Sequence, residues 1–174
     1  MEPAPCYSAF VIISVIGGER AGAEALRLAK EVGRELGRRG VTLLCGGRGG
    51  VMEATCKGAR AEGGHTIGVL PGRNAAETPP NRYVEFPIFT GIGYARNAIV
   101  ALSGEAVIAI SGSYGTLSEI AYALINGVPL VGLDTWDFDY PDWEPSGIVR
   151  VTTAVEAVEK AVAMAEARRA GATK

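Results

Sequence analysis

Apolar runs alternate along this chain with segments whose apolar residues recur every three or four positions. The run AFVIISVI at 9–16 ends in two glycines and is typical of a strand buried on both faces of a parallel sheet. Residues 22–39 follow with helical spacing, and Gly40 ends the predicted helix. The apolar positions of this helix are Ala25, Leu28, Ala29, Val32 and Leu36.

The same alternation continues to the C-terminus and predicts an α/β fold. Pro87 marks one strand as an edge or irregular strand. The predicted strands are 9–16, 41–45, 65–71, 84–90, 106–110, 128–133 and 147–151, and the predicted helices are 22–39, 51–64, 95–104, 117–127 and 154–169. Such alternation indicates a doubly wound, mainly parallel sheet with helices on both faces and right-handed crossovers. With no repeat or long linker, we expect residues 1–174 to form a single domain.

Composition narrows the class of protein. The chain has 48% hydrophobic and 21% charged residues, which is a globular balance, and a net charge of −2, which argues against a nucleic-acid partner. The apolar runs fall far short of the roughly 20 residues that span a membrane. The three cysteines lack CxxC spacing, and the only histidine is His65. We therefore expect no membrane, no metal site, no disulfide framework and a cytoplasmic location.

Two glycine-rich segments follow predicted strands. CGGRGGVME at 45–53 overlaps the end of one strand, and SGSYGTLSE at 111–119 comes directly after another. Ligands of open α/β sheets bind beyond the carboxyl ends of the strands. Glycines let backbone N–H groups turn inward, and a helix directs its positive end at an anion. Thr116 adds a hydroxyl there or caps the following helix. The alternative is an ordinary tight turn from strand to helix.

Arginines are frequent in the loops predicted at this edge of the sheet. They are Arg20, Arg48, Arg73, Arg82 and Arg96, and the acids in the same loops are Glu19, Glu77 and Glu85. This balance indicates a locally basic rim suited to an anionic ligand, although surface loops commonly contain arginines without one.

Two common nucleotide-binding motifs are missing. GGERAG at 17–22 is not GxGxxG, and Cys45 and Gly46 occupy the place where a dinucleotide site has an acid. No GxxxxGK[ST] motif occurs either. The sequence therefore disfavours both a hydride carrier that uses NAD and a P-loop ATPase.

Arg96 and Glu119 open two predicted helices and lie 23 residues apart. Glu119 is expected in the first turn of its helix, within reach of whatever the 111–116 loop holds. A carboxylate beside an arginine suits cleavage of an N-glycosidic bond, in which the carboxylate stabilises a cationic sugar or activates water. The alternative is a buried ion pair that only builds the site.

Three segments together resemble the LONELY GUY (LOG) superfamily, whose members are often labelled "possible lysine decarboxylase". They are GGRGGVMEATCKGA at 46–59, the Arg96–Asn97 pair, and residues 111–119, and the resemblance covers residues 9–133. It implies a Rossmann-like fold and a homodimer or larger homo-oligomer. One branch hydrolyses cytokinin riboside 5′-monophosphates, with catalytic residues that correspond to Arg96 and Glu119. The other branch is the molybdenum cofactor carrier proteins, and the sequence of residues 95–124 is more similar to that branch.

The chain departs from the superfamily pattern at four positions. Ser111 replaces a proline, Ser113 and Arg48 each replace a glycine, and Asn97 stands where the hydrolases usually have a lysine. Arg48 either narrows the pocket or adds a phosphate contact. The resulting ligand-binding set is Gly17, Gly18, Gly46, Gly47, Arg48, Gly49, Asn97, Gly112, Ser113, Gly115 and Thr116.

Three functions follow as hypotheses. The first is a binding protein for a phosphorylated nucleotide-like or pterin ligand, similar to the molybdenum cofactor carriers. The second is a phosphoribohydrolase of nucleoside 5′-monophosphates that needs no cofactor, and the third is an interaction module without a ligand. Lysine decarboxylase activity is disfavoured because the lysines lie away from the strand-end loops. They are Lys30, Lys57, Lys160 and Lys174.

The sequence allows more than one interpretation for each of two segments. Residues 134–145 hold both tryptophans and five acids, and they form a lid, a subunit contact or a loop packed on the domain by its aromatic residues. The apolar helices 95–103 and 117–126 are either buried within one chain or form a dimer face.

Overall fold

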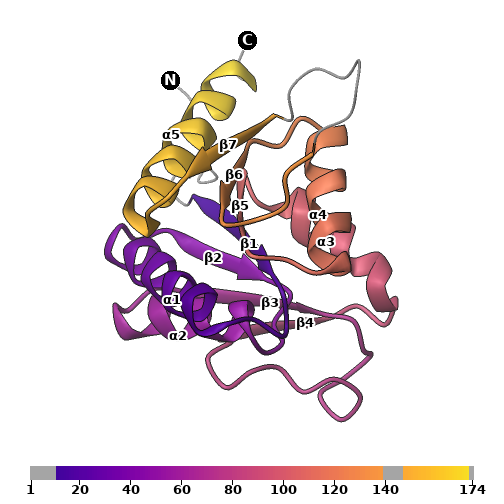
Figure 1. The fold of residues 1–174 in the computed structure, drawn as a ribbon. Helices are drawn as coiled ribbons and strands as arrows, with labels where there is room; N and C mark the ends of the chain where they lie inside the picture. The colour runs from indigo at the N-terminus through magenta and orange to yellow at the C-terminus, as the bar shows by residue number, and fades with distance from the viewer. Residues whose placement is uncertain (1–10, 139–146, 173–174) are drawn as a thin grey trace, which may run out of the picture.

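A seven-stranded parallel sheet organises the protein (Figure 1). The computed structural model describes residues 11–138 and 147–172. The strands are β1 (Ile12–Gly17), β2 (Thr42–Cys45), β3 (Thr66–Leu70), β4 (Phe86–Phe89), β5 (Ala106–Ile110), β6 (Leu130–Leu133) and β7 (Ile148–Val151). The helices are α1 (Ala23–Arg38), α2 (Val51–Ala61), the 3-10 turn η2 (Gly93–Ala95), α3 (Arg96–Ser103), α4 (Tyr114–Ile125) and α5 (Ala154–Ala172). The strand order is β4-β3-β2-β1-β5-β6-β7, with every pair parallel.

Helices cover both faces of the sheet, which confirms the predicted doubly wound α/β class. Residues of α1, α2 and α5 share one buried apolar cluster, and residues of α3 and α4 share the other. Pro87 lies on β4, an edge strand, as its missing N–H predicts. No helix in the described part of the chain is long and apolar enough to cross a membrane.

The strand order reverses at β1, which lies between β2 and β5. Crossovers to either side of this point leave the strand ends uncovered there, and ligands of doubly wound sheets bind at such switch points. Gly17, the last residue of β1, pairs with Ile110 at the end of β5. A Cβ at Gly17 would lie 2.4 Å from Val51 Cγ1 and 2.6 Å from the Ile110 carbonyl oxygen. Glycine thus lets the first turn of α2 pack against the switch point.

Three helix boundaries differ from the sequence expectation by three residues each. Helix α4 begins at Tyr114 rather than 117, because Ser113 is its N-cap and the Ser113 N–H donates to Thr116 Oγ1 at 3.3 Å. Thr116 therefore supports the cap from the third helical position, and Glu119 lies in the second turn instead of the first. Helix α2 stops at Ala61 rather than 64, and α5 continues to Ala172.

Helices α1 and α2 pack with their backbones in close contact. A Cβ at Gly33 would lie 2.0 Å from the Thr55 carbonyl oxygen, and one at Gly58 would lie 2.1 Å from the Lys30 carbonyl oxygen. Any side chain at either position would force the helices apart. This contact fixes the helix that follows the first glycine-rich loop.

Candidate functional site

A cavity of about 670 Å³ opens at the switch point, between the loops that follow β1 and β2 and the start of α3 and α4. Eight of the predicted site residues line it: Gly17, Arg48, Arg96, Asn97, Ser113, Gly115, Thr116 and Glu119. The fold thus brings together both glycine-rich segments and the two predicted catalytic residues. A cavity of this size is typical of a small-molecule site.

The remaining predicted glycines lie outside this lining and shape the loops instead. The Gly18 carbonyl accepts a hydrogen bond of 3.0 Å from the Val51 N–H, which joins the first loop to α2. Gly47 has φ +72°, and its carbonyl accepts from the Asn81 N–H at 2.9 Å. Gly49 lines a neighbouring cavity of about 370 Å³.

Gly46 and Gly112 make room for larger side chains. A Cβ at Gly46 would lie 2.4 Å from Arg96 Nη1, so the guanidinium lies directly against this backbone. A Cβ at Gly112 would lie 2.5 Å from Trp136 Nε1. Gly46 therefore leaves the space in which the Arg96 guanidinium lies, although Gly46 does not line the cavity.

Arg96 and Glu119 meet at the cavity floor. Arg96 Nη1 lies 3.5 Å from Glu119 Oε1, and the two residues are only 5% and 6% exposed. Burial raises the pKa of Glu119 to about 7, although Arg96 acts in the opposite direction. Burial also lowers the pKa of Arg96, opposed by Glu119, Cys45 and Tyr94. Arg96 Nε is buried and has no hydrogen-bond partner within residues 11–138 and 147–172. The cavity is therefore lined by an arginine with an unsatisfied donor and by a carboxyl whose pKa is raised.

Asn97 joins the beginnings of α3 and α4. Its Nδ2 donates to Ser118 Oγ at 2.9 Å and to the Gly115 carbonyl at 3.4 Å, and Ser118 Oγ donates to the same carbonyl at 2.7 Å. The first turn of α4 is thereby held beside Arg96. Because the first N–H groups of a helix lack partners within it, this turn offers donors and a positive dipole end to an anion.

The arginines near the cavity are largely paired, so the rim is less basic than their number indicates. Arg48 Nη2 lies 3.0 Å from Glu19 Oε1, and Arg73 pairs with Glu77. The guanidinium of Arg82 lies 5.7 Å from the centre of the Tyr83 ring. The Arg48–Glu19 pair lines both cavities and forms the boundary between them.

Several cavity residues were not anticipated from the sequence. They are Glu19, Met52, Tyr94, Ala95, Tyr114, Ser118 and Tyr122. Tyr114 lies inside the second glycine-rich motif, and Tyr122 follows Glu119 by three residues, so helical spacing places it on the same face of α4. That spacing was the available signal for Ser118 and Tyr122. Tyr94 is positioned by η2, a short turn without a sequence pattern of its own.

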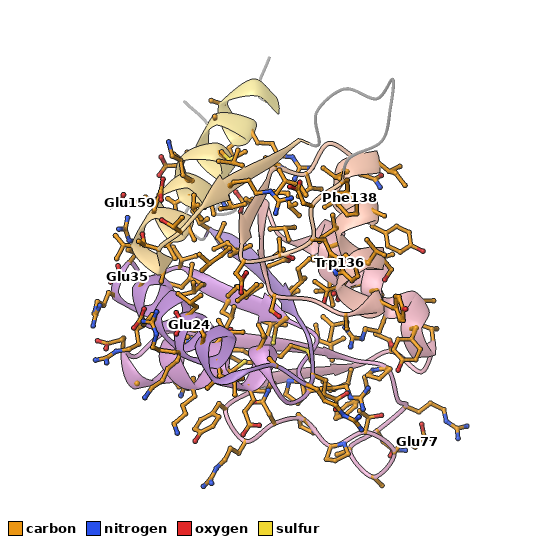
Figure 2. All side chains as sticks on the ribbon, viewed as in Figure 1. Glu24, Glu35, Glu77, Trp136, Phe138 and Glu159 are labelled. Atoms are coloured by element: carbon orange, nitrogen blue, oxygen red, sulfur yellow. The ribbon has the colours of Figure 1, made fainter. Side chains whose placement is uncertain are left out.

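The described part of segment 134–145 packs on the protein. Trp136 and Phe138 contact the apolar cluster on the α3 and α4 side of the sheet (Figure 2). Arg150 on β7 donates from Nη1 to the Thr135 carbonyl at 3.0 Å and from Nη2 to Asp137 Oδ1 at 2.8 Å. These contacts agree with a loop held down by aromatic residues. The rest of the segment, including the second tryptophan, lies outside the described residues.

Comparison with known proteins identifies the class to which this fold and site belong. Residues 10–168 match the SLOG cluster4 family, and the chain is a member of that family. An uncharacterized protein of Archaeoglobus fulgidus is 40% identical over 121 residues, which cover 70% of this chain and 78% of that protein. These matches confirm the resemblance to the LOG superfamily.

Two further relatives represent the two branches considered above. The cytokinin riboside 5′-monophosphate phosphoribohydrolase of Mycobacterium tuberculosis is 35% identical over 121 residues, covering 66% of this chain and 65% of that protein. The molybdenum cofactor binding protein of Rippkaea orientalis has a TM-score of 0.82 and 33% identity, covering 90% of this chain and 98% of that one. The chain is thus similar to both a hydrolase and a cofactor-binding protein.

Proposed function

We propose that this protein binds a phosphorylated heterocyclic small molecule, a nucleoside 5′-monophosphate or a pterin, in the cavity beside α4. The observation that carries the proposal is the buried Arg96 guanidinium, which lines the same cavity as the first turn of α4 and whose Nε has no hydrogen-bond partner among the described residues. A buried donor without a partner is unfavourable, and an anion that accepts from it removes that penalty.

The phosphate would lie against Ser113, Gly115 and Thr116. Their backbone belongs to the N-cap and first turn of α4, and the first turn contains no acidic residue to repel an anion. The Asn97–Ser118 contacts keep this turn in place before the ligand arrives, which reduces the ordering cost of binding.

The molybdenum cofactor is a candidate cargo because of the relative from Rippkaea orientalis. The residues present fit the phosphorylated pterin part of such a cargo. The cavity volume of about 670 Å³ accepts a molecule of drug-like size, and the Arg96 Nε donor suits its phosphate.

A second candidate function is hydrolysis of the N-glycosidic bond of a nucleoside 5′-monophosphate, favoured by the Arg96–Glu119 pair. A carboxyl whose pKa is about 7 exchanges protons efficiently near neutral pH. As carboxylate, Glu119 would stabilise the cationic sugar or take a proton from water. The water oxygen bonds to the sugar carbon, the carbon–nitrogen bond breaks, and the base leaves with a proton.

Calorimetric titration with AMP and adenosine tests the binding proposal. We expect AMP to bind and Arg96→Gln to weaken it by about 10- to 100-fold, because a charge-assisted hydrogen bond contributes about 1.5–3 kcal/mol. Arg39→Gln, which removes a surface arginine paired with Glu159, is the matched control and should bind normally. The proposal fails if neither AMP nor a phosphorylated pterin binds, and if no such molecule is released when the purified protein is denatured and its small molecules are identified by mass spectrometry.

Chromatography of the AMP incubation separates the two candidates. Free adenine and ribose 5-phosphate that vanish in Glu119→Gln would establish the hydrolase. Tight binding of AMP without turnover would favour the hypothesis that the protein is a carrier.

We also propose a homodimer or larger assembly in a reducing compartment such as the cytoplasm. Exposed apolar side chains on α3 and α4, Ile99, Leu102 and Ile125, support an interface there. The odd number of cysteines, without CxxC spacing, is unlike a disulfide framework and supports the reducing compartment. Light scattering during gel filtration tests the assembly.

A further inference from the structure

Three tyrosines line the same cavity as Arg96 and Glu119. Tyr94 lies on η2, Tyr114 begins α4, and Tyr122 lies two turns further along that helix. Their exposed fractions are 74%, 85% and 38%. None of them stacks on another aromatic ring within the part of the chain that the structure describes. Exposed aromatic residues gathered at a hollow surface are typical of a binding site.

Tyr114 lies between Ser113 and Gly115 at the proposed phosphate end, and Tyr122 continues the cavity wall away from that end. Gly115, Ser118 and Tyr122 follow one another at three- and four-residue intervals and lie on the same face of α4. A rise of 1.5 Å per residue puts Tyr122 about 10 Å along the helix from Gly115. Tyr94 lines the cavity from η2, directly before Ala95 and Arg96. The cavity thus carries ring faces beside its anion donors and further along α4.

We infer that Tyr94, Tyr114 and Tyr122 form an aromatic wall that stacks on the planar heterocycle of the ligand. The inference rests on the proposed function and adds its selectivity: the site prefers a phosphorylated heterocycle to the bare sugar phosphate. Stacking on a tyrosine tolerates different rings, because every base or pterin presents a π-face. The wall therefore selects for a ring without specifying which ring.

A second copy of the chain is the competing occupant of these tyrosines. Ile99 and Ile125 on the same helices are also exposed, but they lie outside the cavity lining. The tyrosines differ from them in lining the hollow together with the Arg96–Glu119 pair. Ring selectivity and oligomeric mass are separate measurements, so the two occupants are distinguishable.

The test compares AMP with ribose 5-phosphate by calorimetry in the Glu119→Gln background, in which cleavage does not consume AMP. We expect AMP to bind more tightly than ribose 5-phosphate. Tyr114→Ala and Tyr122→Ala should each weaken AMP binding by about tenfold, as loss of a stacking ring does, and change ribose 5-phosphate binding less than twofold. Tyr114→Phe and Tyr122→Phe retain the ring and should stay within about threefold of the parent. Val155→Ala is the control, an exposed apolar side chain on α5 outside both the cavity and the proposed subunit interface, and it should retain the parent's preference for AMP.

Each other outcome overturns the inference. Equal losses for both probes, or no loss in the alanine variants, would mean that the tyrosines do not contact the ring. A change in oligomeric mass without a change in the AMP preference would assign the tyrosines to a second copy of the chain. If the parent binds AMP and ribose 5-phosphate but the tyrosine variants do not show the expected loss of AMP affinity, only the aromatic wall is refuted and the proposed function stands. If the parent binds neither probe nor a phosphorylated pterin, and releases no such molecule on denaturation, the proposed function falls and the aromatic wall falls with it.

Discussion

Glu119→Gln should abolish a loss of stability that the unliganded protein undergoes as the pH rises from 5 to 8. Burial raises the pKa of Glu119 to about 7 from an ordinary value of 4.5. The native state therefore holds this proton more tightly than the unfolded chain does. Between pH 4.5 and 7 the native state binds more protons, so the free energy of unfolding falls as pH rises, and the full penalty remains above pH 7.

The magnitude follows from the two pKa values, which differ by about 2.5 units. At about 1.36 kcal/mol for each unit, ionising Glu119 costs the native state about 3 kcal/mol above pH 7. The opposing attraction of Arg96 is already contained in the raised pKa. A loss of this size is a large part of the roughly 5–15 kcal/mol that holds a typical domain together.

Urea unfolding at pH 5, 6, 7 and 8 measures the effect. The free energy of unfolding of the parent should fall across the series relative to Glu119→Gln, whose neutral amide has no proton to lose. The variant also leaves Arg96 without its carboxylate, which shifts the whole curve, so the difference in slope is the diagnostic quantity. Glu159→Gln, at a half-exposed site on α5, is the control and should follow the parent. Parallel curves for the parent and Glu119→Gln would refute the reasoning.

Three further substitutions test the packing around the cavity. Gly46→Ala should displace the guanidinium of Arg96, since its Cβ would lie 2.4 Å from Nη1, and weaken AMP binding about tenfold in calorimetry. Gly33→Ala should cost about 3 kcal/mol in urea unfolding, because its Cβ would lie 2.0 Å from the Thr55 carbonyl oxygen. Arg48→Ala removes a partly exposed ion pair and should change stability by less than about 1 kcal/mol. A folded Gly33→Ala protein of parental stability would contradict the close helix contact.

Much of the sheet could be predicted because strands buried on both faces are continuous apolar runs. β1 and β5 fulfil this rule, and Pro87 correctly indicated an edge strand. The meeting of Arg96 and Glu119 could be predicted only in part. Both residues follow parallel strands, whose carboxyl ends share one edge of the sheet, but β3, β2 and β1 separate β4 from β5, so the two strands are not the neighbours that the sequence argument assumed.

Other features depend on tertiary contacts that no local pattern contains. The start of α4 was missed because Ser113 and Gly115 are common turn residues, and the Ser113–Thr116 cap places the first turn of the helix at Tyr114. The pairing of Arg48 with Glu19 joins two separate loops, so the arginines alone overstated the basic rim. Aromatic residues in a sequence are usually assigned to the core, so the pattern did not predict that tyrosines line a cavity.

The close packing of α1 on α2 at Gly33 and Gly58 has a mechanical consequence for the cavity. With the backbones of α1 and α2 touching, neither helix can slide or rotate against the other without a steric clash. The loop that ends at Gly50 leads directly into α2, so we expect this side of the site to be rigid. We therefore expect any adjustment to ligands of different size on the opposite side, at η2 and the beginnings of α3 and α4. There the Asn97–Ser118 hydrogen bond, the carbonyl that both side chains share, and the Arg96–Glu119 ion pair join the two helices.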